Sequence, residues 1–175
     1  MATLTTLRPQ SDEHDPYYCR YISLVPEGDI LATLRSQIAD TQALLKKTGE
    51  ERGNFRYAPG KWSVKEVVGH LSDAERVFGY RALRIARNDQ TPIEGFEQDD
   101  YIRFGPFAHR SLAELLEEYT TVRQSSLCLF NQLDQEAWSR RGTANQATIS
   151  VRAIAFVLAG HELHHRRILK DKYGL

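Results

Sequence analysis

The chain has 175 residues, which suits one compact domain, and with 41% hydrophobic and 26% charged residues its composition lies in the ordinary globular range and argues against a disordered chain. Lysine and arginine total 23, and aspartate and glutamate also total 23, so the basic excess typical of nucleic-acid binders is absent. We therefore expect no nucleic-acid partner.

Four segments with helical periodicity follow one another along the chain. In the first, residues 27–47, apolar positions recur at steps of three and four residues before a helix stop at Thr48-Gly49. The second begins at Ser63, whose side chain can form a capping box with Glu66. Its apolar face then continues through Val67, Leu71, Ala74, Phe78, Ala82 and Ile85.

A long connection follows the second helix. Residues 88–110 are rich in Gly, Pro and Asp, and this loop is longer than most helix connections. It therefore either crosses the bundle or covers a site. Its aromatic side chains could form the wall of a pocket or pack as a small satellite core, and the sequence leaves both open: Phe96, Tyr101, Phe104 and Phe107.

The third and fourth helices complete the set. Ser111 and Glu114 form a second capping box, which begins a helix that runs to about residue 133. The segment RRGTANQATIS is polar and turn-like, and Ser150 then caps a last helix that runs to about residue 172. No strand pattern is convincing, so we predict an all-α fold, a four-helix bundle in a single domain.

Cysteine content and hydropathy indicate the compartment. Cys19 and Cys128 lie far apart and form no CxxC pair, which favours a reducing environment. The first residues, MATLTTLRPQSDEHDPYY, contain no apolar run. No window approaches the roughly 18 apolar residues of a membrane span. We expect a cytoplasmic protein without membrane contact.

Two histidines occupy core positions of the last helix. The apolar stripe that includes Ile154 and Leu158 continues with His161 and His165. Being four residues apart, their imidazoles can bind one metal ion at about 2.0–2.1 Å. An uncoordinated imidazole in an apolar seam needs a hydrogen-bond partner, because burying it without one would cost roughly 1–3 kcal/mol. The alternative, a basic patch at the helix C-terminus, suits His164 better than either core histidine.

A metal site needs at least a third ligand. His70 lies on the inner side of the second helix and is the best candidate. Asp73, one turn further on, could orient the imidazole of His70, or it could pair with Arg76 or Arg81. The remaining histidines lie in segments predicted as loops and are poorer candidates: His14 and His109.

The last helix also fits the HExxH pattern of zinc proteases, from His161 to His165. Those enzymes take a third ligand further along the chain, but only ten residues follow His165 and none is His or Glu. We therefore expect no protease, although Glu162 could accept a proton beside the ion.

Three segments of the sequence resemble the DinB/YfiT-like family, the DinB superfamily: APGKWSVKEVVGHLSDAERVF, YRALRIARNDQTPIEGFEQDD and RGTANQATISVRAIAFVLAGHELHHRRIL. The resemblance covers residues 17–173 and leaves residues 1–16 as an N-terminal extension. It implies an up-down-down-up bundle, a divalent ion such as nickel or zinc, and a homodimer. It also implies that His70, His161 and His165 are the metal ligands.

Several functions fit these features. Three nitrogen ligands with an open position favour metal-dependent hydrolysis, or transfer of a low-molecular-weight thiol, on a small-molecule substrate; the transfer is known among relatives that the sequence resembles. A non-catalytic metal-binding or stress-response bundle is the main alternative. A partner-binding helical module with an incidental histidine cluster is a third. Nitrogen ligands favour nickel, copper or zinc.

Overall fold

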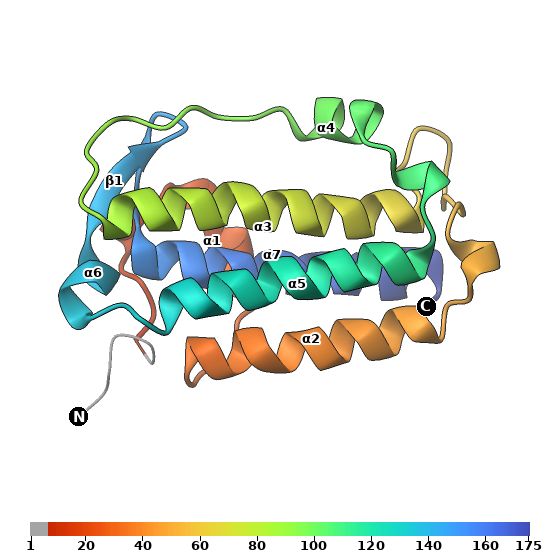
Figure 1. Cartoon of the computed structure of the whole chain (residues 1–175), viewed down its shortest axis with the longest axis horizontal. Coiled ribbons are helices and arrows are strands. Elements are labelled where there is room, and N and C mark those ends of the chain that lie inside the picture. The colour runs from red at the N-terminus through yellow and green to blue at the C-terminus, as the bar shows by residue number, and fades with distance from the viewer. Residues whose placement is uncertain (1–6) are drawn as a thin grey trace.

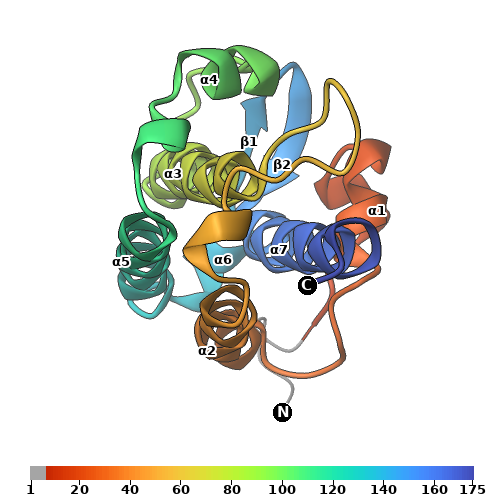
Figure 2. The same ribbon diagram turned by 90° about the vertical axis from the view of Figure 1, so that its right-hand side faces the viewer.

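The computed structural model describes residues 7–175, and four long helices form its bundle (Figure 1). In the end-on view they follow the order α2, α5, α3, α7 around the bundle, so α2 and α3 face each other diagonally (Figure 2). Helices α3 and α5 run in one direction, and α2 and α7 run in the other (Figure 1). The predicted all-α, up-down-down-up bundle is confirmed. Its helices are α2 (Ile30–Lys46), α3 (Val64–Ala86), α5 (Leu112–Phe130) and α7 (Val151–Tyr173).

Side-chain caps determine where these helices begin. Helices α3 and α5 start at the two predicted capping boxes, in which Ser63 and Ser111 accept from the amides of Glu66 and Glu114. Helix α2 starts three residues later than the prediction of residue 27, because Asp29 accepts from the amides of the first turn.

The connection from α3 to α5 runs back along the outer side of α3 (Figure 1). Because α3 and α5 point the same way, the chain has to return the length of the bundle between them. The predicted loop therefore crosses the bundle, and it contains two short helical pieces that the sequence did not indicate. They are α4 (Gln98–Phe104) and the 3-10 helix η4 (Phe107–His109).

The segment between α5 and α7 contains a β-hairpin, so the prediction of no strands was wrong. After the short helix α6 (Gln135–Ser139), β1 (Arg141–Ala144) pairs with β2 (Ala147–Ser150) in antiparallel register. The two turn residues, Asn145 and Gln146, have φ of 50° and 64°, as a tight hairpin turn requires. Four-residue strands without the usual glycine give too weak a local signal, and the hairpin also depends on Ile93, which pairs with Ala144.

The segment before α2 packs against the bundle. It forms the 3-10 helices η1 (Ser11–Glu13) and η2 (Pro16–Tyr18) and the short helix α1 (Cys19–Ile22), which lies beside α7 (Figure 2). Glu13 is buried and pairs with Arg152 of α7. Gly160 lets α1 approach, because a Cβ at this position would lie 2.0 Å from the Tyr21 carbonyl oxygen.

A charged network crosses the core of the bundle. The fully buried Arg123 of α5 binds Glu75 of α3, and its Nη1 also lies 3.1 Å from Gln37 Oε1 of α2 and 2.8 Å from Glu162 Oε2 of α7. Each of the four long helices therefore supplies one member. The remaining short helix, η3 (Glu50–Arg52), leads towards α3 at one end of the bundle. Within residues 7–175, no helix combines the length and apolarity needed to cross a membrane.

Candidate metal centre

Three histidines from two helices meet inside the bundle. His70 projects from α3, and His161 and His165 project from successive turns of α7. The Nε2 atom of His161 lies 3.0 Å from that of His70 and 3.1 Å from that of His165. All three side chains are buried, with at most 9% of their surface exposed. The structure thus brings together the three residues that the sequence singled out.

These separations suit a shared ion. Two nitrogens bound at about 2.0–2.1 Å, with angles between octahedral and tetrahedral values, lie about 2.9–3.4 Å apart. Only one nitrogen of each close pair can donate a hydrogen bond to the other, so three converging Nε2 atoms have no simple neutral arrangement without an added cation or proton. The donor set therefore fits a divalent metal ion.

The buried positions keep these imidazoles neutral. Burial lowers the pKa of His70 to about 4, against a smaller opposing effect of the Asp99 carboxylate. Burial lowers the pKa of His161 and of His165 well below 6.5, and the neighbouring histidines lower both further. Metal ions bind neutral imidazole, so the histidines are in the binding form at neutral pH.

Aromatic rings hold the imidazoles in place. The Trp62 ring lies 4.7 Å from that of His70 and stacks at 6.3 Å on that of His165, while Tyr21 makes an edge contact with His161 at 5.3 Å between centroids. In contrast, His165 Nδ1 has no hydrogen-bond partner among the described residues. The orientation of His165 therefore depends on packing rather than on a polar partner.

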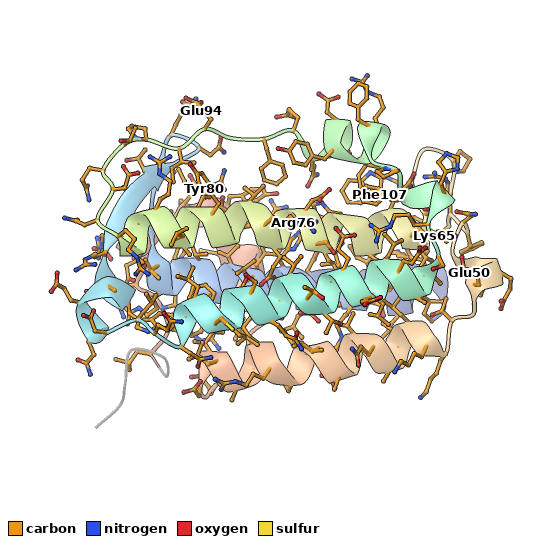
Figure 3. The ribbon with its side chains drawn as sticks, viewed as in Figure 1. Glu50, Lys65, Arg76, Tyr80, Glu94 and Phe107 are labelled. Atoms are coloured by element: carbon orange, nitrogen blue, oxygen red, sulfur yellow. The ribbon has the colours of Figure 1, made fainter. Side chains whose placement is uncertain are left out.

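A glycine directly precedes two of the three histidines. Gly160, before His161, allows the close approach of α1 described above. Gly69, before His70, lies under the Phe107 ring, which a Cβ would approach to 2.2 Å. Figure 3 shows Phe107 between the long connection and α3. These contacts seat the flanking segments on the two helices that carry the histidine cluster.

Two cavities reach the histidine cluster. The first has a volume of about 430 Å³, within the range that accommodates small-molecule ligands, and is lined by His70 and His161. The second, of about 310 Å³, reaches His165 beside Trp62 and Asp99. The remaining walls of the first cavity include Tyr18, Tyr21, Phe78, Arg81, Phe96 and Asn145.

The two acidic residues considered from the sequence lie elsewhere. Asp73 Oδ1 lies 3.5 Å from Arg76 Nη1. Asp73 therefore forms the ion pair with Arg76 that the sequence offered as an alternative to a contact with His70. Glu162 accepts a hydrogen bond from Thr41 and pairs with Arg123 in the buried network. Neighbouring residues of a helix point in different directions, so the Glu162 carboxylate is directed away from the three Nε2 atoms of the histidines. The geometry therefore gives no support to the predicted role of Glu162 as a proton acceptor beside the ion.

The other histidines do not join the cluster. His14 is buried near η1, where its Nδ1 lies 2.9 Å from the Asp15 carbonyl oxygen. His109 is exposed on η4. His164 contacts the Tyr21 and His165 rings but is not among the three converging side chains.

The aromatic residues of the long connection divide between the two expected roles. Phe96 lines the larger histidine cavity. Phe107 is buried in the core, and Phe104 is 77% exposed. Tyr101 packs against Phe96 and faces a different cavity.

Sequence reasoning missed Arg81 as a cavity residue. It was considered only as an ion-pair partner of Asp73, yet it is buried and lines the same cavity as His70. Its position carried a usable signal. It lies eleven residues after His70, just over three helical turns, and therefore on the same face of α3.

Comparisons with known proteins agree with this architecture. The sequence profile of the DinB superfamily matches residues 33–169. YfiT from Bacillus subtilis, described as a probable metal-dependent hydrolase with an unusual four-helix bundle topology, is 14% identical, with a TM-score of 0.72 over 99% of each chain. The DinB-like protein YjoA from the same organism is 19% identical, with a TM-score of 0.57 over 80% of this chain and 85% of that chain. No curated protein matches the sequence.

Proposed function

The chain belongs to the DinB superfamily, and we propose that it is a divalent-metal-dependent hydrolase that acts on a small molecule. One observation carries the proposal. Three buried Nε2 atoms converge, with neighbours at 3.0 and 3.1 Å, beside a cavity of about 430 Å³. The description of YfiT as a probable metal-dependent hydrolase supports the same assignment.

The histidines provide the chemistry of such a site. A divalent ion held by three neutral imidazoles acts as a Lewis acid and can generate a nucleophile near neutral pH. Here His70 supplies one nitrogen from α3, and His161 and His165 supply two from α7. Tyr21 and Trp62 pack on these rings, which limits their rotation and keeps the nitrogens directed at one point.

Three finer features accompany the proposal as predictions. Nickel or zinc is the expected ion, because nitrogen ligands rank these metals highly. A low-molecular-weight thiol is the expected co-substrate if the reaction is a transfer rather than a hydrolysis. A homodimer is the expected assembly. The last two come from the family resemblance.

Metal content is the first test. Protein purified without chelators should contain about one divalent ion per chain by plasma mass spectrometry. His70→Ala should lose the ion while keeping the helical circular dichroism spectrum. His109→Ala is the matched control, because His109 is exposed and outside the cluster, and it should keep the ion. Equal metal content in all three proteins would refute the site.

Activity is the second test. The metal-loaded protein is incubated with activated esters, and separately with electrophiles plus cellular thiols. Turnover that disappears in folded His165→Ala supports a catalytic site. No turnover with any substrate, combined with a large fall in melting temperature on metal removal, would instead indicate that the ion only ties α3 to α7.

A further inference from the structure

Arg81 is a buried cation that forms no ion pair with a carboxylate of residues 7–175. Its side chain is 2% exposed, and its Nε atom has no hydrogen-bond partner within residues 7–175. The two other buried arginines, Arg123 and Arg152, each pair with a glutamate. Burying an unpaired charge is unfavourable, so a buried guanidinium without an anion indicates a role other than stabilising the fold.

The groups around Arg81 do not neutralise it. Its Nη2 donates to the main-chain carbonyl oxygen of Glu94 at 3.1 Å. The Glu94 side chain is exposed and points away from the bundle (Figure 3). The guanidinium carbon lies 5.1 Å from the ring centroid of Phe78 and 5.9 Å from that of Phe96. These rings favour a cation but provide no negative charge.

Other arginines of α3 differ in this respect. Arg76 pairs with Glu118 at 2.5 Å, and Arg84 pairs with Asp89 at 2.6 Å. Both of these arginines are more exposed than Arg81. The two more exposed arginines of α3 thus have carboxylate partners, whereas the most deeply buried one, Arg81, has none among the described residues.

The position of Arg81 relates it to the histidine cluster. Arg81 lines the cavity of about 430 Å³ that also contains His70 and His161. Eleven residues of α-helix separate His70 from Arg81, a rise of about 16 Å along one face of α3. The cavity therefore has a metal-binding group and an unpaired cation at separate points along its length.

Further polar groups line the same cavity. Asn145 lines the cavity from the hairpin turn, where its φ is 50°. Two carboxylates also line the cavity but form no ion pair with Arg81: Asp15, whose Oδ1 accepts from the Tyr17 amide at 2.7 Å, and the exposed Glu97. A ligand that reaches Arg81 thus meets a cation with unused hydrogen-bonding capacity.

We propose that this cavity binds an elongated small molecule whose carboxylate lies at Arg81 and whose reacting group lies at the three histidines. The carboxylate would give the guanidinium the acceptor it lacks, and charge-assisted bonds from arginine to carboxylate are among the strongest in proteins. The placement of the reacting group rests on the proposed function, whereas the carboxylate site rests on Arg81 alone.

The test measures binding rather than turnover. The probes are 3-mercaptopropionate and its longer homologues, whose thiol binds zinc, together with the matching neutral amides. Each is titrated into zinc-loaded full-length protein by calorimetry, with tryptophan fluorescence, to which Trp62 beside the cluster contributes, as a second signal. We expect at least one chain length for which the carboxylate binds about tenfold or more tightly than its amide.

The variants attribute this preference to one residue. Arg81→Met should bring the carboxylate and amide affinities within about twofold of each other. Arg87→Met should retain the preference, because Arg87 directly follows α3 and is exposed. If wild type shows no preference, or if folded Arg81→Met retains it, the inference is overturned.

Two further measurements cover the remaining outcomes. Should Arg81→Met fail to fold, the Arg81 Nε–H resonance of wild type decides: it must shift on addition of the carboxylate and not of the amide. Should the protein bind neither zinc nor nickel, the proposed function fails by itself. Butyrate against butyramide on the metal-free protein then tests the Arg81 site separately, and equal affinities would refute it.

Discussion

Arg123 binds both carboxylate oxygens of Glu75 in the centre of the bundle, from Nε and Nη2, each at 2.9 Å. Its Nη1 faces Gln37 and Glu162, so one guanidinium contacts all three of the other long helices. Such a network has strict geometric requirements, because every member is buried. It fixes how the helices stand relative to one another, and Glu162 directly follows His161.

We predict that Arg123→Met destabilises the protein by about 3–5 kcal/mol, because the substitution leaves two buried carboxylates without their cation. Urea unfolding followed by circular dichroism measures the change. Arg167→Met is the control. Arg167 pairs with Asp171 at the surface, where its side chain is 73% exposed, so its loss should change the stability by less than about 1 kcal/mol. Similar losses for both variants would contradict a structural role of the network.

Two glycine substitutions should have opposite effects. Gly160→Ala places a methyl group 2.0 Å from the Tyr21 carbonyl oxygen, so we expect α1 to shift and the stability to fall by about 1–3 kcal/mol. Gly79→Ala meets only Ser126 Oγ, at 3.5 Å, and should stabilise α3 by about 0.5–1 kcal/mol. Melting curves of the two variants provide the comparison. A stabilising Gly160→Ala would show that α1 does not need this close approach.

Acid should weaken the attachment of the N-terminal segment to α7. Burial alone would raise the pKa of Glu13, but hydrogen bonds from Arg152, the Gln10 amide and Ser150 outweigh it and hold the pKa below 4.5. A carboxyl group with a lowered folded-state pKa stabilises the fold above its unfolded-state pKa, and this contribution disappears as the pH falls through the folded-state pKa.

The measurement compares wild type with Glu13→Gln. The difference in unfolding free energy should be constant near neutral pH and shrink below about pH 4.5. All other carboxyl groups are common to both proteins, so their titration cancels. A difference that does not depend on pH would mean that the Glu13 charge contributes nothing.

Metal binding should be visible as added stability. Zinc at about 100 times its dissociation constant should raise the unfolding free energy by about 2.7 kcal/mol. His165→Ala should show little or no increase at the same concentration, because one of the three converging nitrogens is lost. Comparing each protein with and without zinc removes any effect of the substitution on the metal-free fold. An equal increase in the variant would place the ion elsewhere.

The four long helices could be predicted because their signals are local. Ser63 and Ser111 each cap a helix with a glutamate three residues later, and apolar residues follow at helical spacing. The hairpin and α4 are short, and the Ile93–Ala144 pairing that supports the hairpin joins segments far apart in the sequence. Patterns among neighbouring residues cannot predict such a long-range contact.

The histidine positions could be predicted from helical phase, because core positions occupied by histidine are conspicuous. A search for charged residues at core positions would also have found the buried network. Glu75 and Arg123 both lie in phase with the apolar faces of their helices, α3 and α5. Arg81 is harder. Its helix face is readable from the sequence, but only the folded structure of residues 7–175 shows that no carboxylate forms an ion pair with it.

The distance between the histidines along the chain has a consequence for the order of folding. His70 and His161 are 91 positions apart, and contacts between such distant segments form late, because closing a long loop costs entropy. Helix α3 alone offers one nitrogen and α7 alone offers two. A site with all three nitrogens therefore exists only after both helices have docked, so metal uptake there would report the completion of the bundle and would not nucleate it.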